Sequence, residues 1–141
     1  MNNPDMIELV AARRARCVVS HLPAADPEAA HTGKLINDVQ QVIDDLLAKA
    51  GLLQEKGLPK GYIILDPGIG FGKTKELNWE LLRFAAEVSD YPVMIGYSRK
   101  RFLGEHRMEL EPNLAAGRIA IEAGAAYLRV HDVAGHRSLL N

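Results

Sequence analysis

The sequence predicts an α/β fold built from parallel βα units. Short runs of apolar, often β-branched residues alternate with longer segments whose apolar residues recur at helical spacing. Polar side chains follow directly after these apolar runs, as they do at the carboxyl ends of parallel strands. A glycine-rich loop follows the second run, an arrangement typical of a βα turn that presents a side chain to a small ligand.

The first half of the chain predicts two helices and two strands. Pro4 suits the first turn of a helix, and apolar residues share one face behind it. The second helix is amphipathic and ends at Gly57, a helix-closing residue with a proline two positions beyond it. In chain order we expect a helix at Pro4–Arg16, a strand at Cys17–Val19, a loop at Leu22–Thr32, a helix at Lys34–Lys56 and a strand at Tyr62–Leu65.

The second half repeats the alternation. Leucines and a valine at helical spacing predict the third helix, and Pro112 opens the fourth, which ends near Gly124. In chain order we expect a helix at Glu76–Val88, a strand at Val93–Ile95, a basic loop at Gly96–Arg101, a helix from Pro112 to Gly124, a strand at Tyr127–Val130 and the start of a last helix at His136–Asn141.

Strands that alternate with helices at this spacing form parallel sheets, so we expect the four strands to be buried on both faces. The gathering of polar groups after the strands is also the distribution found on the active face of a (β/α) barrel. A complete barrel has eight strands and about 250 residues. The 141 residues therefore predict either an open four-stranded sheet or half of a barrel.

Composition excludes several classes of function. Hydrophobic residues make up 48% and charged residues 25%, and the formal net charge is −1, so we expect neither a nucleic-acid partner nor an anionic membrane partner. Cys17 is the only cysteine, which excludes a disulfide framework and a cysteine zinc site. The N-terminus lacks the basic and apolar regions of a signal peptide, and no apolar run reaches membrane-spanning length. We therefore expect a cytoplasmic protein.

The segment Asp66–Gly72 ends the second strand and holds three glycines. It is not a Walker loop, because Pro67 stands where that loop needs a glycine. It is not a dinucleotide fingerprint beginning at Gly68 either, because Lys73 stands where the third glycine is needed. Asp66 then has two interpretations: a carboxylate that binds a ligand, or a helix cap, which is a common role for an acid after a strand.

Cations follow the third and fourth strands. Ser98–Arg101 comes directly after the third, and Arg129 and His131 stand two apart on the fourth, so they share a face. A carboxylate such as Asp66 can accept paired N–H donors from a heterocycle, while Arg and Lys can hold phosphate. The residues thus predict a small ligand with an amidine-like ring edge and a phosphate or diphosphate. The alternative for the basic run is a solvated turn.

Three separate motifs resemble those of the dihydropteroate synthase family and occur in the family's order. They are Asp66-Pro67-Gly68-Ile69-Gly70-Phe71-Gly72-Lys73, Gly96-Tyr97-Ser98-Arg99-Lys100-Arg101-Phe102-Leu103-Gly104 and Arg129-Val130-His131-Asp132-Val133. The resemblance begins at Asn3-Pro4-Asp5-Met6 and covers nearly the whole chain. It implies that residues 1–141 are a single, incomplete domain, the C-terminal half of a pterin-binding TIM barrel with strands five to eight.

The resemblance also implies roles for single residues. Pterin would contact Asp66, Lys100, Phe71 and Gly70; p-aminobenzoate would contact Ser98, Arg99, Lys100 and Phe71; the diphosphate would contact Arg129 and His131; Lys100 and Asp66 would be catalytic. The implied reaction joins 7,8-dihydropterin-6-ylmethyl diphosphate to p-aminobenzoate and releases pyrophosphate. Mg²⁺ would bind through the substrate diphosphate, with no metal ligand on this chain, because the family's Asn ligand belongs to the other half. Sulfonamides would inhibit, and the chain would form a homodimer or a larger assembly.

Two departures from the family pattern bear on activity. Ser20-His21-Leu22 stands where the family has Met-His-Met, and the family's first half, with two mobile loops, is absent. The chain alone would therefore be weakly active or inactive. Two alternatives stay open: a pterin- or folate-binding domain of a corrinoid-dependent methyltransferase, which resembles the same barrel, and a non-catalytic half-barrel. The Ser98–Gly104 motif favours the synthase, because a methyltransferase would not need a cationic diphosphate end.

Overall fold

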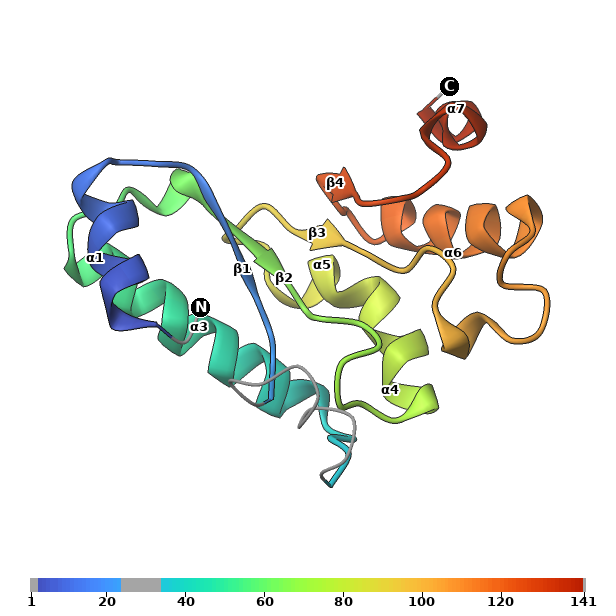
Figure 1. The fold of residues 1–141 in the computed structure, drawn as a ribbon, viewed down its shortest axis with the longest axis horizontal. Coiled ribbons are helices and arrows are strands. Elements are labelled where there is room, and N and C mark those ends of the chain that lie inside the picture. The colour runs from blue at the N-terminus through green and yellow to red at the C-terminus, as the bar shows by residue number, and fades with distance from the viewer. Residues whose placement is uncertain (1–2, 24–33, 141) are drawn as a thin grey trace.

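The fold is α/β with parallel strands, as the sequence predicts (Figure 1). The structure, a computed structural model, describes residues 3–23 and 34–140, so most of the predicted loop Leu22–Thr32 lies outside the described residues. The strands are β1 (Cys17–Ser20), β2 (Ile63–Asp66), β3 (Met94–Ile95) and β4 (Tyr127–Leu128). β1 pairs with β2 and β3 with β4, both in parallel, and a parallel bridge between Leu65 and Val93 connects the two pairs. The strands thus lie in the sheet in chain order.

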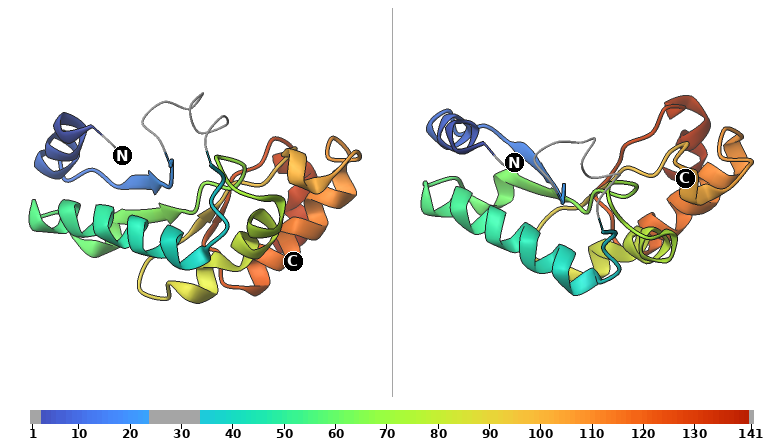
Figure 2. Two further views of the ribbon diagram at one scale, coloured as in Figure 1. Left: turned by 90° about the horizontal axis from the view of Figure 1, so that it is seen from below. Right: turned by 60° about the horizontal axis from the view of Figure 1, so that its bottom comes forward.

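Helices cover one side of the strand layer. The α-helices are α1 (Pro4–Ala12), α3 (Val39–Glu55), α4 (Lys75–Glu80), α5 (Phe84–Glu87), α6 (Leu110–Glu122) and α7 (Val133–His136), and 3₁₀ turns lie at Lys60–Tyr62, Leu81–Arg83, Arg101–Leu103 and Arg137–Leu140. Figure 2 shows α3, α4, α5 and α6 on the same side of the strands. Fully buried side chains, among them Val19, Leu46, Leu65, Leu81 and Ile95, form the core between the strands and these helices. Among the described residues, none of the helices has the length and apolar character needed to cross a bilayer.

The long helix α3 is shorter than the sequence predicts. It begins at Val39 rather than near Lys34, because Ile36 pairs in a parallel bridge with Lys73. The side chain of Asp38 then caps the helix by accepting a hydrogen bond from the backbone N–H two residues later. A helical hydrophobic period cannot reveal this pairing, because the partner strand segment lies more than thirty residues away.

The other helices also differ from their predicted extent, and α6 runs from Leu110 to Glu122 rather than from Pro112 to Gly124. α1 ends at Ala12 rather than Arg16, and the predicted helix Glu76–Val88 is divided into α4 and α5 by a 3₁₀ turn. The last helix begins at Val133, before the predicted His136, and a 3₁₀ turn follows it directly. The divided helix still buries the leucines that predicted it, since its three pieces continue in one direction beside the sheet.

The prediction that all strands are buried on both faces is wrong for the outer two. All four residues of β2 are buried. In β1, Val19 is fully buried but Val18 is 37% exposed, and in β4 Tyr127 is 40% exposed. Among the described residues, β1 and β4 each have a strand neighbour on one side only. Their second faces and outer edges therefore lack the cover that a complete parallel sheet provides.

Candidate active site

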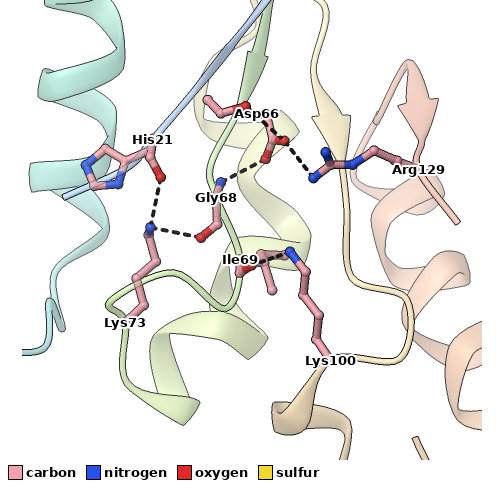
Figure 3. Close-up of polar contacts among 8 residues, drawn as sticks. His21, Asp66, Gly68, Ile69, Lys73, Lys100 and Arg129 are labelled. Atoms are coloured by element: carbon pink, nitrogen blue, oxygen red, sulfur yellow. Dashed lines mark hydrogen bonds and ion pairs between the residues drawn. The ribbon is translucent and has the colours of Figure 1, made fainter. Parts of the chain in front are cut away.

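The carboxylate of Asp66, at the end of β2, lies at the centre of a set of polar contacts (Figure 3). Asp66 is only 1% exposed. One oxygen accepts the backbone N–H of Gly68 at 2.8 Å, and the other accepts the Ser20 hydroxyl and Nη2 of Arg129, both at 3.3 Å. The cap interpretation of Asp66 is wrong, because the hydroxyl of Thr74 caps α4. The carboxylate is therefore held by groups from the loop, from β1 and from the residue that follows β4.

The amine of Lys73 fastens the glycine-rich loop to the end of β1. Lys73 is 6% exposed, and its Nζ donates to the carbonyl oxygens of Gly68 at 2.9 Å, Phe71 at 3.0 Å and His21 at 3.4 Å. Burial lowers the pKa of Lys73 to about 7, although the carboxylate of Asp66 opposes that shift. Gly68 has a φ of 68°, and a Cβ there would lie 2.0 Å from the His21 oxygen. The loop can approach β1 this closely only with glycine at that position.

Lys100 lies against the opposite side of the same loop. Its Nζ donates to the carbonyl oxygen of Ile69 (Figure 3). The same nitrogen lies 4.9 Å from the centroid of the Phe71 ring. Burial lowers the pKa of Lys100 to about 8, against the opposing effect of Asp66. The aliphatic part of the side chain passes Gly70, where a Cβ would lie 3.1 Å from Lys100 Cδ. Lys100 thus joins the loop after β2 to the loop after β3.

A hollow of about 250 Å³ opens beside Lys100. It is lined by Gly96, Ser98, Lys100, Arg129, Val130 and His131. The Ser98 hydroxyl accepts the His131 backbone N–H at 3.3 Å and lies 3.0 Å from His131 Nδ1. The prediction that Arg129 and His131 share a strand is wrong, because β4 ends at Leu128. Both side chains nevertheless line this hollow, because the chain continues along the end of β3.

A larger hollow of about 760 Å³ lies on the other side of Lys100. It is lined by Gly70, Phe71, Lys73, Lys75, Asn78, Arg99, Lys100, Arg101, Phe102 and Arg107. Six of these residues are cationic and none is acidic. The ring of Phe102 packs edge-on against the ring of Trp79, with 5.1 Å between the ring centroids. The hollow thus combines aromatic walls with positive charge.

Asn113, buried on α6, holds the backbone of the cationic wall. Its side-chain oxygen accepts the backbone N–H of Arg99 at 2.8 Å. Its Nδ2 donates to the carbonyl oxygens of Arg107 at 2.8 Å and Glu109 at 2.5 Å. Arg99 has a φ of 60°, a left-handed conformation that is uncommon outside glycine. One buried amide therefore fixes two segments that carry arginines into the larger hollow.

The two hollows share Lys100, and between them they gather the predicted site residues. Gly70, Phe71, Arg99 and Lys100 line the larger hollow, whereas Ser98, Lys100, Arg129 and His131 line the smaller one. Asp66 lines neither hollow, but it forms an ion pair with Arg129, which lines the smaller one. Ser98 lines the smaller hollow with the residues expected to hold diphosphate. Its neighbour Arg99 lines the larger hollow instead.

Sequence reasoning missed several residues that shape the hollows. Lys73 belongs to a motif that resembles the family's, but nothing in the sequence shows that its amine is buried. Asn78 accepts the Gly70 backbone N–H at 2.8 Å, and Asn113 acts similarly on the other wall. An asparagine inside a helix gives no such signal, because its partners come from distant loops. Lys75 lies beyond the motifs altogether.

Within residues 3–23 and 34–140, no group of three or more His, Cys, Asp or Glu side chains could hold a metal ion. His21, which the sequence places after the first strand, turns away from the hollows. Its Nε2 lies 2.9 Å from a carboxylate oxygen of Asp45, and burial lowers the pKa of its imidazole. The polar groups near the hollows are mainly cations and amides, which suit anionic ligands.

Residues 1–131 match the family model described as "Pterin binding enzyme". A curated dihydropteroate synthase from Synechocystis is 33% identical over 141 residues, and the match covers 92% of this chain and 48% of the relative. The chain thus spans about half the length of this relative. The solved dihydropteroate synthase of Thermus thermophilus in complex with 6HMPPP is similar at a TM-score of 0.88 and 35% identity, over 99% of this chain and 59% of that one. The structure of the same enzyme in complex with 4-aminobenzoate is similar at a TM-score of 0.87 and 35% identity, and the match covers 99% of this chain and 60% of that one.

Proposed function

The chain belongs to the family of pterin binding enzymes, and we propose that it carries the substrate-binding half of a dihydropteroate synthase. The proposed reaction joins 7,8-dihydropterin-6-ylmethyl diphosphate to p-aminobenzoate and releases pyrophosphate. The observation that carries the proposal is the meeting of three sequence motifs around two hollows that share Lys100. The names of the relatives described above support a synthase over a corrinoid-dependent methyltransferase.

We propose further that residues 1–141 form one domain and that β1–β4 correspond to strands five to eight of a TIM barrel. Two features support this assignment. The strands are parallel and lie in chain order, and the helices α3, α4, α5 and α6 lie on one side of them, as the outer layer of a barrel does (Figure 2). The site residues follow the carboxyl ends of the strands, which is where barrel enzymes place their active sites.

The pterin is assigned to Asp66, Gly70, Phe71 and Lys100. Oδ2 of Asp66 accepts a hydrogen bond from Arg129, which is the kind of donor that the amino-pyrimidine edge of a pterin also presents. The Arg129 side chain is 57% exposed, so it can leave this contact at little cost. When Arg129 turns to an anion, Oδ2 keeps only the hydrogen bond from the Ser20 hydroxyl and can accept a donor of the pterin. In this proposal the binding of diphosphate prepares the pterin site.

Lys100 is the proposed catalytic cation. Its pKa of about 8 keeps it mainly protonated at neutral pH. It holds the carbonyl oxygen of Ile69 and lies beside both hollows, so a short movement would bring its amine to the pterin carbonyl. A preorganised ammonium stabilises charge that develops in the transition state without a large cost of reorganisation.

The diphosphate is assigned to Arg129 and His131 in the smaller hollow. Arg can bind two phosphate oxygens at once, and the nearby Lys100 adds a second positive charge. These groups would stabilise the leaving diphosphate as its bond to the pterin methylene breaks. The described residues offer no carboxylate in this hollow for a resident metal, so Mg²⁺ would bind through the diphosphate oxygens, the hard ligands it prefers.

The p-aminobenzoate, and sulfonamides as its competitors, are assigned to the larger hollow. Phe71 supplies an aromatic wall, and Arg99 and Lys100 supply positive charge for the carboxylate. Ser98 is the remaining proposed contact, and it lies in the smaller hollow, on the diphosphate side of Lys100. The aryl amine would then approach the pterin methylene from the side opposite to the diphosphate.

We also infer that copies of the chain associate. Val18 on β1 and Tyr127 on β4 are 37% and 40% exposed, and each of these strands has an unpaired edge within the described part of the chain. Open edges pair with other chains, and burial of apolar surface contributes about 25 cal/mol per Å². Light scattering of the purified chain should therefore show a dimer or a larger assembly. A monodisperse monomer would contradict this inference.

Pterin binding to the 141-residue chain tests the proposed function. The substitution Asp66→Asn replaces an acceptor oxygen by an N–H donor that faces the donors of the pterin ring. Calorimetry with a pterin should show binding to the unsubstituted chain and none to the variant, while the circular dichroism spectra stay alike. Equal affinity in the two proteins would overturn the assignment of Asp66. A pyrophosphate-release assay with both substrates then measures how far the chain alone supports catalysis.

A further inference from the structure

The hydroxyl of Tyr97 and the imidazole of His136 are two buried polar groups that the proposed function does not use. Tyr97 is fully buried in the loop after β3, and His136, on α7, is 6% exposed. Their rings are neighbours, with 6.0 Å between the ring centroids. Among the described residues, the Tyr97 hydroxyl and Nε2 of His136 have no hydrogen-bond partner. Unpaired buried polar atoms destabilise a fold, so two of them side by side point to a common partner.

The two atoms have complementary hydrogen-bonding roles. Nδ1 of His136 lies 2.6 Å from the backbone carbonyl oxygen of Asp132, which can only accept. The proton of the neutral ring is therefore on Nδ1, and Nε2 is an acceptor. Burial raises the pKa of Tyr97, so its hydroxyl keeps its proton and can donate. His136 also lines a cavity of about 40 Å³, which has room for one water.

Tyr97 belongs to the strand end against which both proposed diphosphate ligands lie. The guanidinium of Arg129 passes across Gly96, where a Cβ would lie 2.7 Å from Nη2. The hydroxyl of Ser98 accepts the backbone N–H of His131 at 3.3 Å. The position of this strand end therefore sets the positions of both ligands. The side chain that can anchor it from behind is that of Tyr97, which lies between its two neighbours in the chain.

The Tyr97 side chain packs between α6 and α7. Its oxygen lies so close to Gly117 of α6 that a Cβ on this glycine would overlap it. On α7 it neighbours His136, which is tied through Nδ1 to Asp132, the residue that follows His131. A link from Tyr97 to His136 would thus join the end of β3 to the segment after β4 a second time, in addition to the hydrogen bond at the hollow itself. Two links fix the relative position of two segments better than one, and a preorganised site binds more tightly.

We propose that Tyr97 and His136, joined through one buried water, are positioning residues for the diphosphate site. The Tyr97 hydroxyl donates to the water, and the water donates to Nε2 of His136. The pair does not touch the substrate. It holds the two segments that carry Arg129 and His131 at the spacing that diphosphate needs. The proposal rests on the proposed function, because it needs the diphosphate to bind in the smaller hollow.

Calorimetry of pyrophosphate binding to the 141-residue chain tests this inference. Tyr97→Phe removes the hydroxyl and keeps the ring, whereas His136→Leu removes the acceptor. We expect each to weaken pyrophosphate binding about fivefold. The double variant should also lose about fivefold rather than about 25-fold, because either change breaks the same link. His136→Gln keeps an acceptor and a donor and should recover most of the affinity.

Tyr91→Phe is the matched control. It removes the same atom from a hydroxyl that accepts a hydrogen bond from Gln54 at 3.0 Å, and Tyr91 lines neither hollow. Pyrophosphate affinity should therefore not change in this variant. The affinity for p-aminobenzoate should change less than about twofold in Tyr97→Phe, because Asn113 holds the backbone of Arg99 in the larger hollow independently.

The imidazole ¹⁵N resonances of His136 give a readout in the unsubstituted chain, so the test does not depend on whether a variant folds. We expect Nδ1 to carry the proton and Nε2 to have the shift of a hydrogen-bond acceptor. The Nε2 resonance should then move in Tyr97→Phe and stay in Tyr91→Phe. A role of Tyr97 in packing alone would leave the Nε2 resonance unchanged.

The outcomes separate this inference from the proposed function. Unchanged pyrophosphate affinity in Tyr97→Phe, additive losses in the double variant, or an Nε2 resonance without a hydrogen bond each overturn the link and leave the proposed function intact. Failure of pyrophosphate to bind the unsubstituted chain overturns the diphosphate assignment in the proposed function, and the inference with it.

Discussion

The loop after β2 (the β2 loop, Asp66–Thr74) and the segment after β3 (the β3 loop, Gly96–Glu109) line the same hollow but treat their charges in opposite ways. The β2 loop turns its ionic groups inward, so that Asp66 and Lys73 are buried and bind neighbouring backbone and side chains. The β3 loop turns its arginines outward, and its backbone is held by a buried amide from α6. The first arrangement stabilises a fixed surface, whereas the second leaves charges free for a ligand. The two loops should therefore respond differently to equivalent substitutions.

The largest difference is expected between two glycines. In Gly68→Ala the new Cβ would lie 2.0 Å from the His21 carbonyl oxygen at a φ of 68°, whereas in Gly104→Ala, at a φ of 92°, no atom lies within 4 Å. The first substitution must separate the β2 loop from β1, so we expect a loss of at least about 3 kcal/mol in the free energy of unfolding. The second should cost about 1–3 kcal/mol, because Gly104 also has a ψ of −162° and this backbone conformation is essentially confined to glycine. Urea unfolding measures both, and equal losses would remove the distinction between the loops.

Two lysines provide the next comparison. Lys73→Met leaves three carbonyl oxygens without their shared donor, so we expect the free energy of unfolding to fall by about 2–4 kcal/mol. Lys100→Met removes one hydrogen bond, to Ile69, and the contact of the amine with the Phe71 ring, and should cost about 1–2 kcal/mol. Pterin affinity should show the reverse order, because only Lys100 is assigned to the ligand. A variant at Lys73 that unfolds like the unsubstituted chain would show that the amine does not support the loop.

The pH dependence of stability follows from the same buried amine. The pKa of Lys73 is about 7 in the folded chain, and its ordinary value is 10.5. Between these values the unfolded chain binds more protons, so stability rises with pH by up to about 1.4 kcal/mol per pH unit, and it falls again as pH decreases toward the folded value. Lys100, with a pKa of about 8, adds a rise of the same sign above that pH. Between about pH 7 and pH 8, the free energy of unfolding should rise less steeply with pH in Lys73→Met than in the unsubstituted chain. An equal rise in the two proteins would contradict the low pKa of Lys73.

The sequence predicts the features that depend on local pattern. Alternating strands and helices give the parallel fold, and the apolar run that ends at Asp66 gives the position of the carboxylate. It does not predict that Val18 is exposed, because burial of an outer strand depends on what lies beside it in space. Nor does it predict the extent of α3, since the bridge that displaces its start joins two distant segments.

The site is predicted less completely than the fold. The motifs identify the residues around Lys100, because glycines and cations at strand ends are visible in sequence. The supporting contacts are not visible: Lys73 binds three carbonyl groups from separate positions, and Asn113 binds a loop that precedes its helix. The grouping of Ser98 with His131 rather than with Arg99 is a matter of loop geometry, which no spacing rule gives.

The smallest effect on stability is expected for Arg129→Gln. Its ion pair with Asp66 spans 3.3 Å, but the arginine side chain is 57% exposed, so solvent screens the attraction. Asp66 also keeps the hydrogen bonds from Gly68 and Ser20, and we therefore expect the free energy of unfolding to change by less than about 1 kcal/mol. Arg118→Gln, which breaks another exposed ion pair away from the hollows, is the matched control and should change stability by as little.

The two arginine variants should differ in their affinity for anions. Arg129 lines the smaller hollow with Lys100 and His131, so Arg129→Gln should weaken pyrophosphate binding about tenfold, whereas Arg118→Gln should not change it. Crystals grown with sulfate should hold the anion at the same place. Suppose instead that Arg129→Gln loses several kcal/mol in the free energy of unfolding and keeps its affinity for pyrophosphate. Arg129 would then be a structural counter-ion of the buried Asp66, because removing the partner of a buried carboxylate strongly destabilises the fold. Loss of affinity at constant stability would instead show that the charge at the end of β4 is available to a ligand, as in the β3 loop.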